Sequence, residues 1–486
     1  MPAKVLVLIL MVSLFLSSCK LGKNQDQDYE LPNIVLIIGD DFGYPYYGFM
    51  GADYLQTPNL DELARQGVVF TRGFTPSNYC RPSLLSLTTG ILPIQYQTKL
   101  NVMMGQEKQG QDFSQFSDEE LQRWELDFEG RALRYFTSLP GLLSEKGYVS
   151  FQCGKWWEED YQIGGFTEGR KVRRQDPAAD VEFVRSRYLD SFFGEIRPTG
   201  ESVQPVLDFI DQNTHQPFFI WFAPPLPHYP FNAPEKYYNL YRDKDMSESA
   251  KRYYANCTWF DDGLGILMNH MKETGEFENT LFIYVSDNGW EQNPDQEFWH
   301  DPIRSKDGGD KGKKSMFDQS FRTPIIFTWE VRIAKGKVKE DLIYIPDIPA
   351  TVLDYVGLPA PKQYYGKSYR TVIVGTDSNL RNEIIGDATQ TREWWKGEAY
   401  WLRNDKWFFT WNATADTEVL YNMDDDPFSN NDVAGDYPEL VDKYKKRLKS
   451  GDHMLYLHLK MSSSCGIHFT TGLEAGRHIN PGFKIN

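Results

Sequence analysis

Two pairs of adjacent polar residues follow apolar segments that lie far apart in the chain. Asp40 and Asp41 come shortly after the run NIVLII, and Asp287 and Asn288 follow the run TLFIYV. Continuous apolar runs rich in β-branched residues are typical of strands buried on both faces of a parallel sheet. Because the carboxyl ends of parallel strands meet at one edge of the sheet, we expect these four side chains to lie together.

Carboxylates that share one site disfavour each other's ionisation unless a cation neutralises them. Oxygen ligands suit Ca²⁺ or Mg²⁺ better than Zn²⁺. Taken together, the two pairs predict a metal site built from oxygen atoms, although either pair alone is equally compatible with a solvated loop.

A cysteine lies near the start of the segment YCRPSLLSLTTG. Cys80 is followed by Pro82 and Ser83, and the segment closes with Thr89 and Gly90. This pattern resembles the signature of the type I sulfatases, a family of the alkaline phosphatase superfamily. In that family the cysteine is oxidised to formylglycine (3-oxoalanine), whose hydrate attacks sulfur as a nucleophile. The start of a helix suits such a nucleophile, because the backbone N–H groups there favour an anion. The alternative is a buried structural cysteine.

Further segments resemble motifs of the same family and keep their order. GKW at 154–156 matches its lysine motif, Pro227 with His228 matches its histidine motif, and the segment 313–324 matches the region of its second lysine. The resemblance therefore extends over about 300 residues, with several motifs in register.

The resemblance implies roles for individual residues. One Ca²⁺ is bound by carboxylates, an amide and the modified cysteine, two lysines neutralise charge on the sulfate and bind substrate, and a histidine protonates the departing oxygen or contacts sulfate. The implied metal ligands are Asp40, Asp41, Cys80, Asp287 and Asn288, and the other implied residues are Lys155, Lys313 and His228. The implied partners are a sulfated glycan or other small sulfate ester, and the maturase that makes formylglycine.

Two positions depart from the family pattern and resemble a divergent bacterial branch. Leu84 stands where the family has an arginine four residues after the cysteine, and Trp157 stands where it has a histidine. Arg81 is the candidate to compensate for the missing arginine in substrate binding, although a residue next to Cys80 points differently on a helix from one at i+4. An indole is a hydrogen-bond donor only, so Trp157 cannot act as a base.

The elements that must position these residues alternate between strands and helices. Short apolar strands are expected at 33–38, 217–222, 280–285 and 324–327, and helices at 59–66, 139–146, 202–213 and 250–273. This alternation predicts an α/β fold, with a large doubly wound, mostly parallel sheet and helices on both faces. An expected hairpin at 398–411 and helix at 438–449 indicate a small C-terminal α+β subdomain.

The start of the chain has the pattern of an export signal. Lys4 precedes an apolar run of about a dozen residues, too short to span a bilayer comfortably. The run ends in LSSC, which resembles a bacterial lipoprotein box with Cys19 as the lipid-bearing residue. We therefore expect an exported protein that is anchored by lipid in the cell envelope, in the periplasm or at the cell surface. An ordinary secretory signal is the alternative.

The expected organisation has four parts. A lipoprotein signal peptide at 1–19 precedes a polar tether at 20–30, a sulfatase-like catalytic domain at 31–365, and a small subdomain with a tail at 366–486.

Composition excludes some classes of protein. The chain has 486 residues, and its 52 basic and 68 acidic residues give a net charge of −16, which argues against a nucleic-acid-binding protein. Five cysteines cannot form a disulfide-rich scaffold in a chain of this length. Three functions stay open: a sulfatase, which the motifs favour, a phosphate or phosphonate monoester hydrolase of the same superfamily, and a non-catalytic sulfatase-like lipoprotein that binds glycans.

Overall fold

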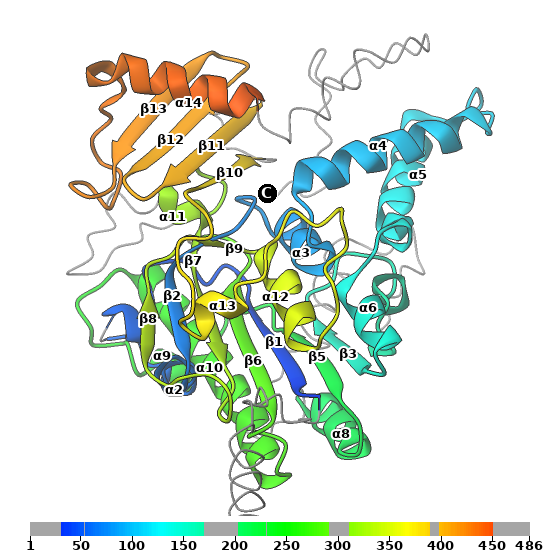
Figure 1. Ribbon diagram of the computed structural model, residues 1–486, viewed down its shortest axis with the longest axis vertical. Coiled ribbons are helices and arrows are strands. Elements are labelled where there is room, and N and C mark those ends of the chain that lie inside the picture. Colours follow the sequence, from blue (N-terminus) through cyan, green and yellow to red (C-terminus); the bar gives the residue numbers. More distant parts are fainter. Residues whose placement is uncertain are drawn as a thin grey trace, which may run out of the picture. The chain divides into compact units, whose positions relative to one another are not determined.

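The computed structural model describes residues 31–52, 54–169, 203–229, 231–290, 311–388 and 398–450. The expected signal peptide at 1–19, the tether at 20–30 and the tail after residue 450 lie outside these residues. In the described part, a mixed sheet of nine strands forms the centre (Figure 1). In spatial order its strands are β4 (Glu168–Gly169), β3 (Val149–Gly154), β5 (Phe218–Ala223), β1 (Asn33–Gly39), β6 (Thr280–Ser286), β7 (Arg322–Thr328), β2 (Val68–Phe74) and β8 (Lys337–Lys339), and β9 (Ile343–Tyr344) also pairs with β2.

Most strand pairs in this sheet are parallel. β3, β5, β1 and β6 are parallel neighbours, whereas β7 runs antiparallel to both β6 and β2. β2 therefore points the same way as β6, β4 is parallel to β3, and β8 and β9 are parallel to β2, so the carboxyl ends of eight of the nine strands lie toward one edge of the sheet. The first residue of β7, Arg322, pairs with the last residue of β2, Phe74, so the segment before β7 reaches that same edge.

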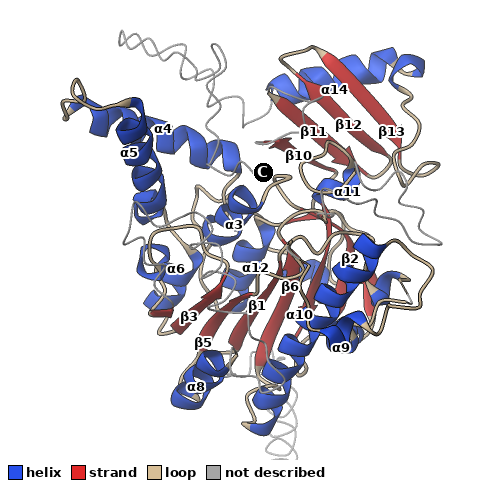
Figure 2. Cartoon of the chain, turned by 180° about the vertical axis from the view of Figure 1, so that it is seen from behind, coloured by secondary structure: helices blue, strands red, loops and turns tan. Residues whose placement is uncertain are grey.

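Both faces of the sheet are covered by helices, as the buried apolar strands predict (Figures 1 and 2). On one face Val35 and Ile37 of β1 join a core with α2 (Pro58–Gln66), α8 (Gln204–Asn213) and α10 (Glu248–Glu273). On the other face α3 (Cys80–Thr89), α6 (Leu139–Glu145) and α12 (Asp347–Tyr355) contact one another. The predicted α/β class with a mostly parallel sheet is confirmed.

The described residues also form further helices. They are the longer α4 (Pro93–Gln109) and α5 (Asp118–Arg131), the short α9 (Glu235–Tyr238), α11 (Asp318–Phe321) and α13 (Arg370–Ile373), and the 3-10 turns η1 (Gly48–Met50), η2 (Ala132–Tyr135) and η3 (Tyr161–Gly164). Among the described helices, none combines the length and the apolar character that crossing a membrane requires.

A second, four-stranded antiparallel sheet follows in the chain. Its strands are β10 (Glu383–Ala388), β11 (Ala399–Asn404), β12 (Trp407–Asn412) and β13 (Thr417–Asn422), and the turn η5 (Ala434–Asp436) leads to the helix α14 (Pro438–Ser450). One face of this sheet packs on α14 through residues such as Leu402 and Tyr444. The expected hairpin and helix are confirmed, and the predicted boundary at 365/366 falls in the loop before α13.

The other face of the small sheet packs against the large domain. Trp401 and Phe408 share an apolar cluster with Phe74 and Phe321. Beside this cluster, the Arg403 guanidinium donates to a carboxylate oxygen of Asp318 across 3.0 Å, and both side chains are buried. The small sheet thus contacts the end of β2 and the helix α11, at the edge of the sheet where the strands end.

Candidate active site

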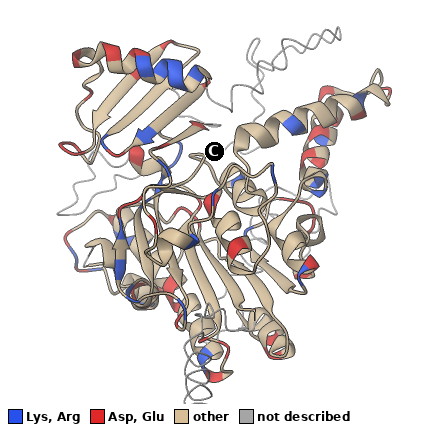
Figure 3. Cartoon of the chain, in the orientation of Figure 1, with Lys and Arg blue, Asp and Glu red and all other residues tan. Residues whose placement is uncertain are grey.

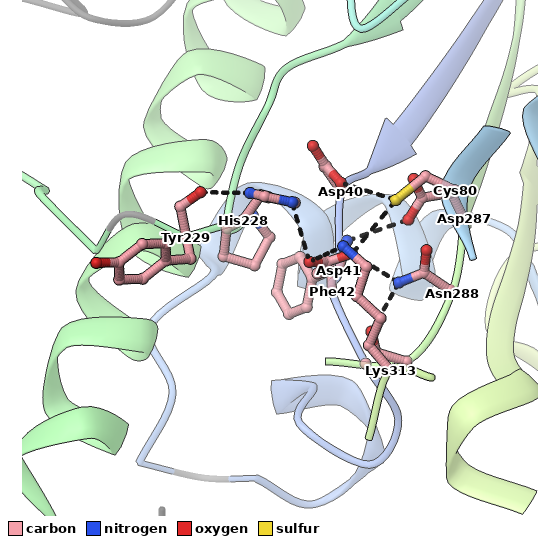
Figure 4. A network of polar contacts seen from close by, with 12 residues as sticks. Asp40, Asp41, Phe42, Cys80, His228, Tyr229, Asp287, Asn288 and Lys313 are labelled. Atoms are coloured by element: carbon pink, nitrogen blue, oxygen red, sulfur yellow. Dashed lines mark hydrogen bonds and ion pairs between the residues drawn. The ribbon is translucent and has the colours of Figure 1, made fainter. Parts of the chain in front are cut away.

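The charged residues of the candidate site follow the carboxyl ends of neighbouring strands. The strands β3, β5, β1 and β6 contain no Asp, Glu, Lys or Arg themselves (Figure 3). Lys155 follows β3, His228 lies in the loop after β5, Asp40 and Asp41 follow β1, and Asp287 and Asn288 follow β6. The parallel direction of the four strands therefore brings side chains from distant segments to one place, as the sequence predicts (Figure 4).

The backbone at Asp41 lets two consecutive carboxylates face the same centre. Side chains of an extended strand alternate between its two faces, but Asp41 has φ 65°, in the left-handed region that Asp tolerates better than most residues. Its backbone N–H donates to Asp287 Oδ1 across 3.1 Å, and the N–H of Phe42 donates to Ser286 Oγ across 3.0 Å. These bonds tie the end of β1 to the end of β6.

Cys80 is the first residue of α3 and points at the carboxylates. Its Sγ lies 3.9 Å from Asp40 Oδ1 and 3.8 Å from Asp41 Oδ1. Pro82 fits in the first helical turn, where no backbone N–H is required, and Ser83 Oγ donates to the carbonyl of Ser77 across 3.2 Å. Gly90 ends the helix with φ 66°, a conformation that favours glycine.

Two buried lysines neutralise part of the acidic cluster. Lys155 Nζ donates to Asp40 and, across 3.0 Å, to Asp287 Oδ2. Lys313 Nζ donates to Asp41 Oδ2 across 2.8 Å. Among the described residues, three carboxylates therefore face two ammonium groups, an excess of one negative charge before His228 is counted.

The close charges shift the pKa values of the cluster in different directions. Burial alone would raise the pKa of Asp41, but Lys313, His228 and Lys155 outweigh it and hold this pKa well below its usual range. Burial raises the pKa of Asp287 to about 6. The carboxylates of Asp40 and Asp41 add to this rise, and the ammonium group of Lys155 opposes it. The two lysines therefore stabilise the ionised form of Asp41 more strongly than that of Asp287.

The thiol of Cys80 is a poor nucleophile in these surroundings. Burial raises its pKa well above the ordinary value, the carboxylate of Asp287 raises it further, and the two lysines oppose that shift. Since the thiolate is the reactive form of cysteine, the unmodified side chain stays protonated and unreactive here.

His228 faces the site with one ring nitrogen. Its Nδ1 donates to the carbonyl of Tyr229, and its Nε2 lies 3.6 Å from Asp41 Oδ2 (Figure 4). Asn256 of α10 holds this loop, because its amide donates to the carbonyls of Pro227 and His228 across 3.4 and 3.3 Å. A histidine oriented in this way can exchange a proton at the Nε2 atom.

Oxygen and sulfur atoms suited to a metal ion lie close together. Ligand atoms of Asp40, Asp41, Cys80 and Asp287 all lie within 4.8 Å of one another, and all four residues are buried. Asn288 donates to Asp41 Oδ1 across 2.6 Å, and its buried Oδ1 has no hydrogen-bond partner among the described residues. A buried carbonyl oxygen without a partner beside three carboxylates fits a hard cation.

Arg81 is the one predicted site residue that turns to other partners. Its guanidinium donates to Glu158 across 3.1 Å and to the carboxylate of Glu129 across 2.8 Å. Its predicted role in substrate binding stays a prediction. Leu84 is buried, and Trp157 has a buried Nε1 with no partner in the described part of the chain.

Some supporting residues could not be recognised from their sequence context. Asn256 lies inside a long helix, and nothing in its neighbourhood indicates a contact with the histidine loop. The sequence points only weakly to a role for Tyr79 and Lys314, because its one indication is that each directly neighbours a motif residue in the chain. The Nζ atoms of Lys313 and Lys314 lie 5.8 and 5.6 Å from the centre of the Tyr79 ring.

Comparison with known proteins adds to this geometry. The Sulfatase family model matches residues 32–358, and a model described as N-sulphoglucosamine sulphohydrolase, C-terminal, matches residues 309–453. N-acetylgalactosamine-6-sulfatase of Homo sapiens is 28 % identical over 68 % of this chain, and the match spans 63 % of that relative's length. An ulvan-active sulfatase of Formosa agariphila is 23 % identical over 88 % of this chain and 82 % of its own.

Solved structures share the fold. The crystal structure of Ps i-CgsB in complex with k-i-k-neocarrahexaose has a TM-score of 0.65 at 20 % identity, over 90 % of this chain and 98 % of that one. The phosphonate monoester hydrolase of Agrobacterium radiobacter has a TM-score of 0.58 at 17 % identity, over 88 % and 96 % of the two chains.

Proposed function

The chain belongs to the sulfatase family, and from this premise we propose that it hydrolyses sulfate esters on sulfated carbohydrates. The observation that carries the proposal is the position of Cys80, at the start of α3 and within 4 Å of the carboxylates of Asp40 and Asp41, each of which also contacts a buried lysine. We further propose that Cys80 is converted to formylglycine and that the acidic cluster binds Ca²⁺.

Formylglycine fits this position better than the thiol does. Carboxylates and burial keep the Cys80 thiol protonated, because they raise its pKa. A hydrated aldehyde is neutral and offers hydroxyl donors, which suit a site lined by carboxylate acceptors. The hydrate of the modified residue would offer two hydroxyl groups on one carbon, one to attack sulfur and one to assist the later release of sulfate, which no standard side chain offers.

Calcium fits the donor set and its charge. Asp40, Asp41, Asp287 and Asn288 would hold the ion together with the side chain at position 80. The excess of carboxylates over ammonium groups among the described residues and the Asn288 Oδ1 without a hydrogen-bond partner there support a cation here. Bound calcium supplies a positive charge that polarises a sulfate oxygen and eases deprotonation of the nucleophile.

The chain's own residues account for the remaining chemistry. Lys155 and Lys313 neutralise charge that grows on sulfate oxygens in the transition state, where fixed ammonium groups are most effective. The first N–H groups of α3 are not capped by the side chain of Tyr79, so they can also face an anion. His228 gives a proton from Nε2 to the departing alcohol oxygen, while its Nδ1 bond to Tyr229 holds the ring.

The names of the relatives support a carbohydrate substrate. Among them are sulfatases of N-acetylgalactosamine 6-sulfate and of ulvan. The chain matches less than two thirds of the first of these, so the choice of substrate belongs to the proposal. Phosphate and phosphonate esters are the competing substrates, because a phosphonate monoester hydrolase shares the fold.

Mass spectrometry of the Cys80 peptide tests the nucleophile. After co-expression with a formylglycine-generating maturase, the mass of the peptide is expected to be lower than that of the unmodified peptide by the difference between cysteine and formylglycine. The Cys80→Ala variant is expected to lose turnover, whereas Cys257→Ala, at another buried cysteine in α10, serves as the matched control. An unmodified thiol, with full activity in Cys80→Ala, would contradict the formylglycine mechanism.

A substrate panel separates the three candidate functions. Sulfate release from an aryl sulfate and from sulfated sugars is expected to be faster than phosphate or phosphonate release from matched esters. Faster phosphate or phosphonate release would favour the competing hydrolase. Glycan binding without turnover of any ester, by protein in which Cys80 is converted, would favour the non-catalytic lipoprotein.

We also propose that the protein is exported and anchored by lipid on Cys19. The proposal rests on the LSSC sequence after a short apolar run. Metabolic labelling with a radioactive fatty acid is expected to mark the full-length protein in the membrane fraction of bacterial cells. Cys19→Ser is expected to abolish the label, and a labelled Cys19→Ser protein would refute the anchor.

A further inference from the structure

A tyrosine and a lysine lie beside the nucleophile position without a part in the chemistry above. Tyr79 directly precedes Cys80, and Lys314 directly follows Lys313. Both side chains are partly exposed, whereas Cys80 and Lys313 are buried. The two residues therefore lie where the buried acidic cluster gives way to solvent.

The backbone directs the two consecutive lysines to different partners. Lys314 has φ 66°, a left-handed conformation that is strained for a residue other than glycine. The conformation is held from both sides, because Lys313 N–H donates to Trp290 O across 2.8 Å and Lys314 N–H donates to Asn78 O across 3.2 Å. Strained residues that are held in this way are concentrated at ligand-binding sites.

The two ammonium groups have different surroundings. Lys313 Nζ is paired with Asp41, whereas Lys314 Nζ has no ion pair or hydrogen bond with another described residue. The Lys314 Nζ lies over the Tyr79 ring, 5.6 Å from its centre, and the Lys313 Nζ lies 5.8 Å from the same ring. The face of an aromatic ring attracts a cation, so the Tyr79 ring can hold the Lys314 ammonium group in this position.

We propose that Lys314, held by the ring of Tyr79, binds an anionic group on the sugar next to the one that carries the scissile sulfate. The anionic group is a carboxylate or a second sulfate. The inference rests on the proposed function and adds a substrate class to it, namely oligosaccharides with an acidic neighbouring sugar. An ammonium group suits both anions, because it acts as a point charge with three rotatable donors.

Binding to the Cys80→Ala protein tests this inference without turnover. The probes are N-acetylgalactosamine 6-sulfate, its disaccharide with a uronic acid, its disaccharide with a sulfated neutral sugar, and its disaccharide with an uncharged sugar. Calorimetry is expected to show at least one of the acidic disaccharides binding about tenfold more tightly than the uncharged disaccharide. Lys314→Gln is expected to remove that preference, and Lys314→Arg is expected to retain most of it.

Two further variants separate a specific contact from general effects. Tyr79→Leu removes the ring that holds the ammonium group and is expected to reduce the preference severalfold. Lys339→Gln, in the edge strand β8, removes another partly exposed lysine and is expected to leave the preference intact. The uronic acid and the second sulfate are compared directly by their two disaccharides.

The outcomes distinguish this inference from the proposed function. If the formylglycine-containing enzyme cleaves an aryl sulfate, either of two results overturns the role of Lys314 alone. One is a preference for acidic disaccharides that survives in Lys314→Gln, and the other is a wild-type protein that shows no such preference. If that enzyme cleaves no sulfate ester, the proposed function fails, and the role of Lys314 fails with it. Equal loss of affinity for all probes in Lys314→Gln also overturns the inference, because it indicates a general electrostatic effect.

Discussion

Replacing Lys313 by methionine tests how the acidic cluster balances its charge. The Nζ atom of Lys313 lies 2.8 Å from Asp41 Oδ2, and the two side chains are 4 % and 0 % exposed. Methionine keeps much of the length of the side chain and removes the charge. Three buried carboxylates then face the single ammonium group of Lys155, so the net charge of these groups changes from −1 to −2.

The expected cost is that of breaking a buried ion pair. Removing one partner of such a pair leaves an uncompensated charge and destabilises proteins by about 3–5 kcal/mol. We expect Lys313→Met to lose this much of its free energy of unfolding when a chelator removes divalent cations. Turnover of an aryl sulfate is expected to fall by a factor of about 10² to 10³, which is typical of losing one fixed group that stabilises charge in the transition state.

Calcium is expected to stabilise the variant more than the wild type. A ligand that binds the folded state at about 100 times its Kd adds about 2.7 kcal/mol to stability. The cluster of Lys313→Met is more negative and therefore attracts Ca²⁺ more strongly than the wild-type cluster does. Denaturant unfolding of both proteins, in chelator and in a series of Ca²⁺ concentrations, measures the difference.

The control for this experiment is Lys339→Met, which removes a partly exposed lysine at the edge of the sheet. It is expected to change stability by less than about 0.5 kcal/mol. A loss below 1 kcal/mol for Lys313→Met in chelator would refute the cost assigned to the buried pair. Equal stabilisation of Lys313→Met and the wild type by Ca²⁺ would refute the assignment of the ion to this cluster.

Three further predictions follow from named contacts. Asn288→Ala removes the unpartnered carbonyl oxygen, so calorimetry is expected to show Ca²⁺ affinity reduced by about tenfold or more. Arg81→Gln breaks the charged contacts with Glu158 and Glu129 and is expected to lower the free energy of unfolding by about 1.5–3 kcal/mol, measured by denaturant titration. Burial raises the pKa of Asp261 from 3.8 to about 7 in the folded protein. Between these pH values the folded state therefore binds more protons than the unfolded state, so the free energy of unfolding falls as pH rises from about 4 to 7. Asp261→Asn is expected to flatten this fall in unfolding experiments at several pH values.

The sheet and the acidic cluster are predictable because their patterns are local. The runs that become β1 and β6 are continuously apolar, and each is followed within two residues by its polar pair. Such runs are buried on both faces, which favours a parallel sheet, and parallel strands end at one edge. The pairing of β1 with β6 then brings Asp41 within hydrogen-bonding distance of Asp287.

Other features depend on contacts that no local pattern contains. β7 is an apolar strand much like its neighbours, and nothing in its sequence distinguishes it as the strand that runs antiparallel to β6 and β2. The left-handed backbone of Asp41 is likewise not visible in the sequence, because Asp is compatible with several conformations. Arg81 turns to Glu129, 48 residues away, and this choice of partner depends on where α5 lies.

The contacts of the small subdomain connect it to the position of Lys313. Lys311, two residues earlier, donates from Nζ to the carbonyl of Phe428 across 2.8 Å. Asp318, five residues later, accepts from Arg403 of β11 across 3.0 Å. The segment that carries Lys313 is therefore held at both ends by residues of the small subdomain. Because a charge that is fixed before the reaction stabilises a transition state without reorganisation, the second sheet contributes to the site by fixing both ends of the segment that carries the Lys313 ammonium group.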